Sequence, residues 1–132
     1  MTASIRAGLV YFVCVFAVAT GLGAIRVLFV APALGPIPAV LIELPLLLGW
    51  SWFVAGRIPS ARPFVMGATA FVVLMIAELS LFVLTNQGTA AAFLTRFRGL
   101  AELIGLLGQI LFGLIPLLRR YRQTSAADKL AL

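Results

Sequence analysis

Histidine is absent from this chain of 132 residues, and cysteine occurs once, as Cys14. One chain therefore lacks the residues for a disulfide, a zinc site built from thiolates or imidazoles, and a Ser-His or Cys-His nucleophile. No phosphate-gripping loop or nucleophile–base arrangement is present either. We expect no metal, no cofactor and no catalytic residues, and thus not an enzyme. Cys14 lies between Val13 and Val15, which indicates a small buried apolar residue.

Charge is also scarce, because 11% of the residues are charged and 63% are hydrophobic. Soluble domains average about 25% charged and about 45–50% apolar residues. With a mean hydropathy of +1.16, the composition is typical of an integral membrane protein of one domain. The net charge of +6 resembles that of a nucleic-acid-binding protein. The basic residues lie between and after apolar runs, however, so we expect the lipid bilayer as partner and no nucleic acid.

Four apolar runs are long enough to cross a bilayer, which takes about 20 residues. They cover about 7–31, 38–56, 63–85 and 99–118. Each should be an α-helix, because lipid offers no partner for an unpaired backbone amide. The sequence therefore predicts an all-α four-transmembrane-helix bundle with short hairpin loops. Residues 1–120 would form this single domain, and residues 121–132 a polar cytoplasmic tail that frays at the membrane surface.

The connections between the runs differ in character. Proline and glycine between Pro32 and Pro38 predict a short uncharged turn, and residues 56–63 predict a second turn. The third connection, residues 86–98, is longer. Phe93, Phe97 and Leu100 fall at i, i+4 and i+7, which suits a short helix in the membrane interface. An irregular loop with scattered aromatic residues fits this segment equally well.

Basic residues predict the orientation. With both termini in the cytoplasm, the inner side carries seven basic residues and the outer loops carry two, Arg96 and Arg98. The positive-inside rule therefore favours cytoplasmic termini. We expect a multi-pass protein of the bacterial inner membrane, within a homo-oligomer or a larger membrane complex. A cleaved signal peptide is disfavoured, because the first apolar run is far longer than such a peptide requires.

Four ionisable residues interrupt the apolar runs: Arg26, Glu43, Glu78 and Glu102. A charge in hydrocarbon costs from about 3 to more than about 10 kcal/mol, so such residues seldom lack a use. At about 1.5 Å of rise per residue, Arg26 and Glu43 lie at a matched depth of about 7–8 Å on either side of the first turn. We therefore predict that Arg26 and Glu43 form an ion pair.

The other two carboxylates lie in the same half of the membrane. Glu78 is about 10 Å deep and has no polar neighbour within its own helix, and Glu102 is about 4–5 Å deep. Arg98 precedes Glu102 by four residues, so an ordinary i,i+4 pair is expected there. Gln109 lies mid-span and is suited to hydrogen bonds between helices. Arg26, Glu43, Glu78, Glu102 and Gln109 form the predicted binding or coupling cluster.

Small residues indicate which helix faces pack closely. Ala17, Gly21 and Ala24 recur at three- and four-residue spacings, and so do Ala101, Gly105 and Gly108. Such stripes let helix backbones approach one another. Ala19, Gly23 and Arg26 share another face of the first helix, which directs Arg26 into the bundle. Pro116 is expected to end or kink the last helix.

Two functions fit these observations almost equally. The first is an accessory or assembly subunit of a membrane complex, in which buried Arg and Glu residues pair the helices. The second is a proton-coupled or ion- or small-solute-binding or transport protein, using Arg26, Glu43 and Glu78, because carboxyl groups that exchange protons are common coupling elements in transporters. An enzyme acting on lipid ranks far below both.

Overall fold

The computed structural model describes residues 1–85 and 87–132 and confirms the all-α four-helix prediction. Four helical segments are long and apolar enough to cross a membrane: Thr2–Leu34, Pro36–Arg57, Pro63–Leu84 and Leu100–Ala131. The elements in chain order are α1 (Thr2–Ile25), η1 (Arg26–Val30), α2 (Ala31–Leu34), α3 (Pro36–Arg57), α4 (Pro63–Leu84), α5 (Ala90–Thr95), η2 (Arg96–Arg98) and α6 (Leu100–Ala131). The chain is thus a multi-pass membrane protein.

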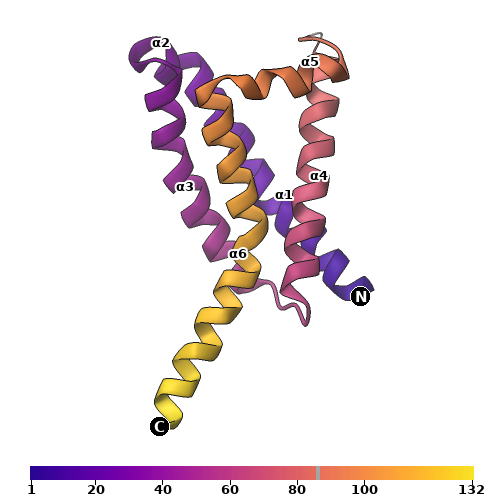
Figure 1. Ribbon diagram of the computed structural model, residues 1–132, viewed down its shortest axis with the longest axis vertical. Helices are drawn as coiled ribbons and strands as arrows, with labels where there is room; N and C mark the ends of the chain where they lie inside the picture. Colours follow the sequence, from indigo (N-terminus) through magenta and orange to yellow (C-terminus); the bar gives the residue numbers. More distant parts are fainter. Residues whose placement is uncertain (86) are drawn as a thin grey trace.

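The long helices form a ring in which α1 and α6 are each flanked by α3 and α4. Both termini and the α3–α4 connection lie at one end of the bundle, here called the terminal end (Figure 1). The α2–α3 turn and α5 lie at the other end, here called the α5 end. Because the chain crosses four times, the two termini return to the same side. The last turns of α6 extend away from the other helices (Figure 1).

The first connection is more helical than predicted. The first span continues through a π-helical turn, Arg26–Val30, and then α2, so that Gly35 alone separates it from α3. Pro32 and Pro36 lie at the starts of α2 and α3. Amides in the first turn of a helix make no hydrogen bond within it, so proline, which lacks the N–H, costs nothing there. Gly35 has φ +89°, a conformation that L side chains rarely adopt. The predicted loop was therefore too long.

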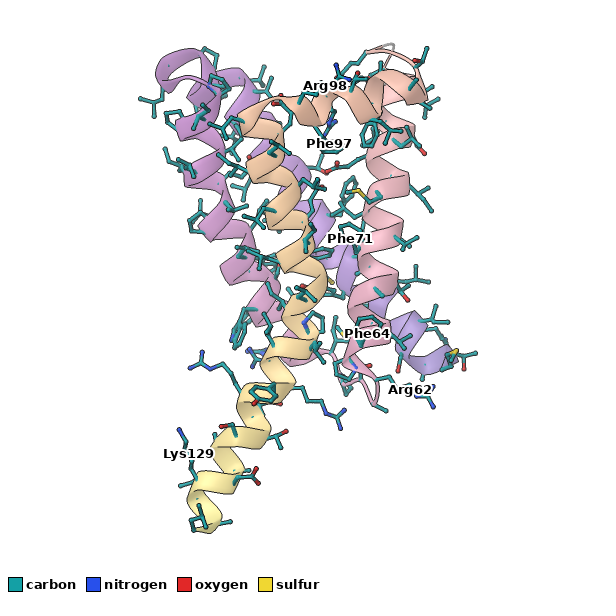
Figure 2. The ribbon with its side chains drawn as sticks, viewed as in Figure 1. Arg62, Phe64, Phe71, Phe97, Arg98 and Lys129 are labelled. Carbon is teal, nitrogen blue, oxygen red and sulfur yellow. The ribbon has the colours of Figure 1, made fainter. Side chains whose placement is uncertain are left out.

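The third connection contains the predicted short helix, formed by α5 and the 3₁₀ turn η2. Thr89 caps α5 by accepting a hydrogen bond from the amide of Ala92. Phe93 is buried beneath this segment, and Phe97 lies on its side facing the bundle (Figure 2). Asn86, with which we predicted the loop to begin, lies outside the described residues. The aromatic stripe thus faces the other helices.

The packed core lies toward the terminal end. Its largest members are Tyr11, Met66, Leu74, Phe112 and Ile115, which come from α1, α4 and α6. Most other large apolar side chains are exposed on the outside of the bundle, as a lipid-facing surface requires. Cys14 belongs to that surface, so its prediction as a buried residue was wrong. Cys14 is compatible with lipid and with a protein core, because both are apolar. The apolar residues beside it therefore do not distinguish a lipid-facing position from a buried one.

The glycines that bring α1, α4 and α6 together are not those of the predicted stripes. A side chain at Gly8 would collide with the carbonyl of Met66, and one at Gly67 with the carbonyl of Gly113. The helices α1, α4 and α6 therefore approach closely at these positions. The predicted stripe of Ala17, Gly21 and Ala24 is exposed instead, so that part of the prediction was wrong. Gly108, from the other predicted stripe, is buried against Leu44.

Pro116 does not end α6, which continues to Ala131 and includes most of the predicted tail. Proline removes the amide that would bond to the carbonyl four residues earlier, here that of Phe112. The hydroxyl of Tyr11 donates a hydrogen bond of 2.9 Å to this same carbonyl. The Tyr11 ring also stacks on that of Phe112, with centroids 4.7 Å apart. A side chain from α1 thus replaces the hydrogen bond that Pro116 removes.

We predict that Tyr11→Phe lowers the free energy of unfolding by about 1 kcal/mol, a typical contribution of an interhelical hydrogen bond in a membrane. The same change in a Pro116→Ala background should cost clearly less, because the introduced alanine restores an amide for the carbonyl of Phe112. Reversible unfolding in mixed detergent micelles measures both effects. Equal costs in the two backgrounds would show that Pro116 and Tyr11 are not coupled.

Candidate functional site

A cavity of about 590 Å³ lies between the four long helices. Its deeper walls are apolar and include Phe12, Val15, Leu48, Leu74 and Phe112. Toward the α5 end, its walls carry the charged and amide side chains. The charged and amide side chains of the lining are Arg26, Glu43, Glu78, Arg96, Glu102 and Gln109, together with Gln87. All five residues of the predicted cluster therefore line one cavity.

Arg26 and Glu43 form the predicted ion pair, between Nε of the guanidinium and Oε2 of the carboxylate. Arg26 is the first residue of the π-helical turn, and Glu43 lies on α3 beyond the Gly35 turn. Both side chains are largely shielded, with 33% of Arg26 and 15% of Glu43 exposed. Ala19 and Gly23 line the same cavity, which confirms the predicted inward face of the first helix. The pair joins the first and second spans.

Glu78 contacts two partners from other elements. The amide nitrogen Nε2 of Gln109 on α6 donates a hydrogen bond of 2.6 Å to Oε1 of Glu78. A guanidinium nitrogen of Arg96 lies 3.4 Å from Oε2. Gln109 thus bridges helices as expected. The carboxylate of Glu78, which has no polar neighbour in its own helix, obtains its partners from α6 and η2.

Arg96 is a site residue that the sequence analysis missed, because a residue in a predicted outer loop was expected at the surface. Its guanidinium carbon lies 4.6 Å from the ring centroid of Phe93, 5.1 Å from that of Phe97 and 5.9 Å from that of Phe82. Aromatic faces attract a cation at such distances. The available signal was spacing, since Arg96 follows the buried Phe93 by three residues and so shares its helical face. Arg96 therefore connects the α5 segment to Glu78.

Glu102 does not pair with Arg98, so that prediction was wrong. The two ion pairs found in residues 1–85 and 87–132 are Arg26–Glu43 and Arg96–Glu78. Glu102 lies in the first turn of α6 with its carboxylate against Gly99, where the helix dipole favours a negative charge. Arg98 instead lies on the outer side of the η2 turn (Figure 2). The break between η2 and α6 at Gly99 removes the i,i+4 relation that the spacing implied.

The predicted cluster consequently divides into two contacts on one cavity. Arg26 pairs with Glu43 at the first hairpin, and Glu78 pairs with Gln109 and Arg96 beside α4 and α6. With every group ionised, the lining carries two cations and three carboxylates. Such a surface offers donors and acceptors to a polar group that enters from the α5 end. The apolar walls below it suit the hydrocarbon part of the same molecule.

The described residues include no group of three or more His, Cys, Asp or Glu side chains that could hold a metal ion. The polar groups that line the cavity are carboxylates, guanidiniums, amides and the hydroxyls of Thr20 and Ser51. In comparisons with known proteins, no family model, no curated protein and no solved structure matches this chain.

Proposed function

We propose that this protein binds a small polar or amphipathic solute in the intramembrane cavity and moves it across the membrane. The observation that carries the proposal is the cavity itself. Four helices contribute to it, and the four ionisable residues of the spans all line it. Charges that served helix pairing alone would have no need of an open volume beside them, because an unfilled cavity weakens packing.

The size and chemistry of the cavity support a ligand with a polar end. A volume of about 590 Å³ lies within the range of small-molecule sites. The carboxylate of Glu78 and the guanidinium of Arg26 each have a partner within the protein, which lowers the cost of holding them in the membrane. A ligand can take the place of such partners when it enters. Transport would then require the packed core at the terminal end to open.

We further propose that the protein lies in a bacterial inner membrane with both termini in the cytoplasm. The terminal end carries Arg6, Arg57, Arg62 and the basic residues that begin with Arg119, whereas the α5 end carries Arg96 and Arg98. This distribution follows the positive-inside rule. The cavity would then face the periplasmic half of the bilayer, and a solute would enter from that side.

The test fills the cavity without disturbing the helices. At Gly105, which lines the cavity, an added Cβ would meet no atom within 4 Å, and the same holds at the exposed Gly21 outside it. Protein purified from native membranes in mild detergent is extracted, and the bound small molecules are identified by mass spectrometry. We expect a solute that the wild type and Gly21→Leu retain and that Gly105→Leu loses.

A second variant tests the chemistry of the cluster. Glu78→Gln should leave expression and folding intact, because Gln can still accept from Gln109, yet it should lower retention of the solute about tenfold or more. Identical small-molecule profiles for wild type, Gly105→Leu and Glu78→Gln would refute solute binding. Collapse of the fold on Glu78→Gln would instead support a structural role.

Two observations favour a second function, that of an accessory or assembly subunit. Both intramembrane ion pairs join different elements, Arg26 to α3 and Arg96 to α4, as helix-pairing contacts would. The end of α6 also extends from the bundle with its residues exposed, which offers a surface to a partner chain (Figure 1). The same purification decides between the functions. A stoichiometric larger partner supports the accessory function, and a homo-oligomer that retains a solute supports transport.

A further inference from the structure

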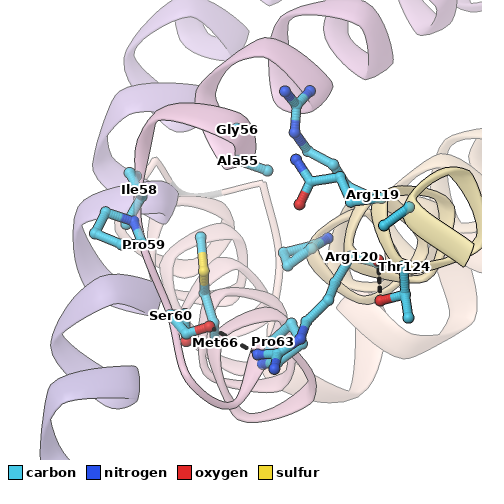
Figure 3. Close-up of a pocket in the computed structure, with 13 residues that line it drawn as sticks. Ala55, Gly56, Ile58, Pro59, Ser60, Pro63, Met66, Arg119, Arg120 and Thr124 are labelled. Carbon is cyan, nitrogen blue, oxygen red and sulfur yellow. Dashed lines mark hydrogen bonds between the residues drawn. The ribbon is translucent and has the colours of Figure 1, made fainter. Parts of the chain in front are cut away.

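A second pocket, separate from the charged cavity, lies at the terminal end and has a volume of about 570 Å³ (Figure 3). It is lined by the end of α3, the α3–α4 connection, the start of α4 and the part of α6 from Pro116 onward. Thirteen described residues line it, and none is a carboxylate. Its ionisable side chains are Arg119 and Arg120, and its neutral polar side chains are Ser60, Gln123 and Thr124. The lining therefore offers positive charge and hydrogen-bond donors.

The two arginines take positions on different sides of the pocket. Nη1 of Arg120 donates hydrogen bonds of 3.3 and 2.8 Å to the carbonyls of Ser60 and Ala61, which holds the side chain against the loop (Figure 3). Nη1 of Arg119 donates a bond of 2.9 Å to the carbonyl of Trp52. A side chain at Gly56 would overlap the guanidinium of Arg119, so glycine makes room for it there.

These contacts leave much of the arginines' capacity unused. Each guanidinium carries five N–H donors and a full charge, and the partners named above are neutral carbonyls. The guanidinium carbon of Arg119 also lies 5.4 Å from the ring centroid of Trp52, which is a neutral partner too. Nε of Arg119 is buried and has no hydrogen-bond partner among the described residues. Neither arginine takes part in the ion pairs of residues 1–85 and 87–132. Two arginines without a carboxylate partner among the described residues make the pocket suited to an anion.

We propose that this pocket binds the phosphate group of an anionic molecule, and that its occupant is the headgroup of an anionic phospholipid. Arginine pairs favour phosphate because their planar donors match its oxygens. The pocket lies where the membrane-crossing part of α6 passes into its polar extension, at the level of a lipid headgroup. Basic pockets between membrane helices are known to hold such headgroups. Free phosphate shares this chemistry, so the test separates the two sources.

The experiment measures lipid binding to the full-length protein in detergent by native mass spectrometry. We expect phosphatidylglycerol to bind the wild type about tenfold more tightly than phosphatidylcholine, whose choline group repels a basic pocket. Arg120→Gln should abolish this preference. Arg122→Gln removes the same charge from α6 outside the pocket and should keep it. To test free phosphate as the occupant, inorganic phosphate is added to lipid-free protein and the change in thermal stability is measured.

Gln123→Glu keeps both arginines of the pocket and adds a negative charge, which should repel a bound anion. It places a carboxylate in the pocket, and the matched control Ala126→Glu places one on the same exposed helix outside it. A loss of lipid binding confined to Arg120→Gln and Gln123→Glu supports the lipid site. The same pattern with inorganic phosphate alone supports a phosphate site and overturns its assignment to lipid. Equal binding of the two lipids without a phosphate effect, or equal losses in the controls, overturns the proposal.

Discussion

Arg26→Met should lower the free energy of unfolding by about 3–5 kcal/mol, the usual cost of removing one partner of a buried ion pair. The change leaves the carboxylate of Glu43, of which 15% is exposed, without its counter-charge inside the membrane. Methionine is unbranched and uncharged and replaces the aliphatic part of the arginine side chain, so the loss mainly reports the stranded carboxylate. No other ion pair to Glu43 is present in the described residues.

The double change Arg26→Met with Glu43→Met should be less damaging than Arg26→Met alone. It removes both charges together, and replacing a whole buried pair by apolar residues often costs little. Reversible unfolding in mixed micelles gives the three free energies for a double-mutant cycle. Equal losses in the single and double variants would contradict the ion pair. A strong coupling energy would place this pair among the contacts that hold the first hairpin.

Gly67→Ala should cost about 3 kcal/mol, near the upper end of the usual overpacking penalty. A Cβ at this position would collide with the carbonyl of Gly113, and that backbone atom has no rotamer into which it can move. The helices α4 and α6 would have to separate. Because Met66 and Ala70 beside it are almost completely shielded, the separation would disturb the core around them.

The matched control for this prediction is Gly49→Ala on the exposed face of α3. A Cβ there meets no atom within 4 Å, so the change should be neutral or, through helix propensity, stabilising. The gain in the second case would be at most about 1 kcal/mol. Thermal unfolding of both variants under one set of conditions measures the contrast. A Gly67→Ala protein as stable as Gly49→Ala would show that α4 and α6 do not approach closely at this position.

The two predictions also bear on the proposed solute site. Gly67 is buried in α4 next to the core residue Met66, and Arg26 lies in the cavity wall. A transport protein would need the core around Gly67 to open. It would also need Arg26 to exchange Glu43 for the solute. Selective loss of solute binding in Arg26→Lys, with stability retained, would support the exchange. The charge remains in that variant while the planar geometry of the guanidinium is lost.

The four spans follow from the amino-acid sequence alone, because the cost of an unpaired amide in lipid leaves little choice but helices of about 20 apolar residues. The Arg26–Glu43 pair follows from it as well. Helical rise converts sequence position into depth, and a short connection makes the two spans neighbours. The spacing of Phe93 and Phe97 suggested the short helix after α4, although an irregular loop fitted that segment equally well. Each of these inferences depends on local geometry or on one hairpin.

Most of the helix faces that meet became clear only from the three-dimensional packing. Lipid and protein core are both apolar, so hydropathy did not separate the exposed Gly21 and Cys14 from the buried Gly8 and Gly67. The approach of Arg96 to Glu78 likewise depends on how α5 folds back over the bundle. The charged side chains gather around one cavity through contacts between distant segments. The periodicity of a uniformly apolar helix carries no information about such contacts.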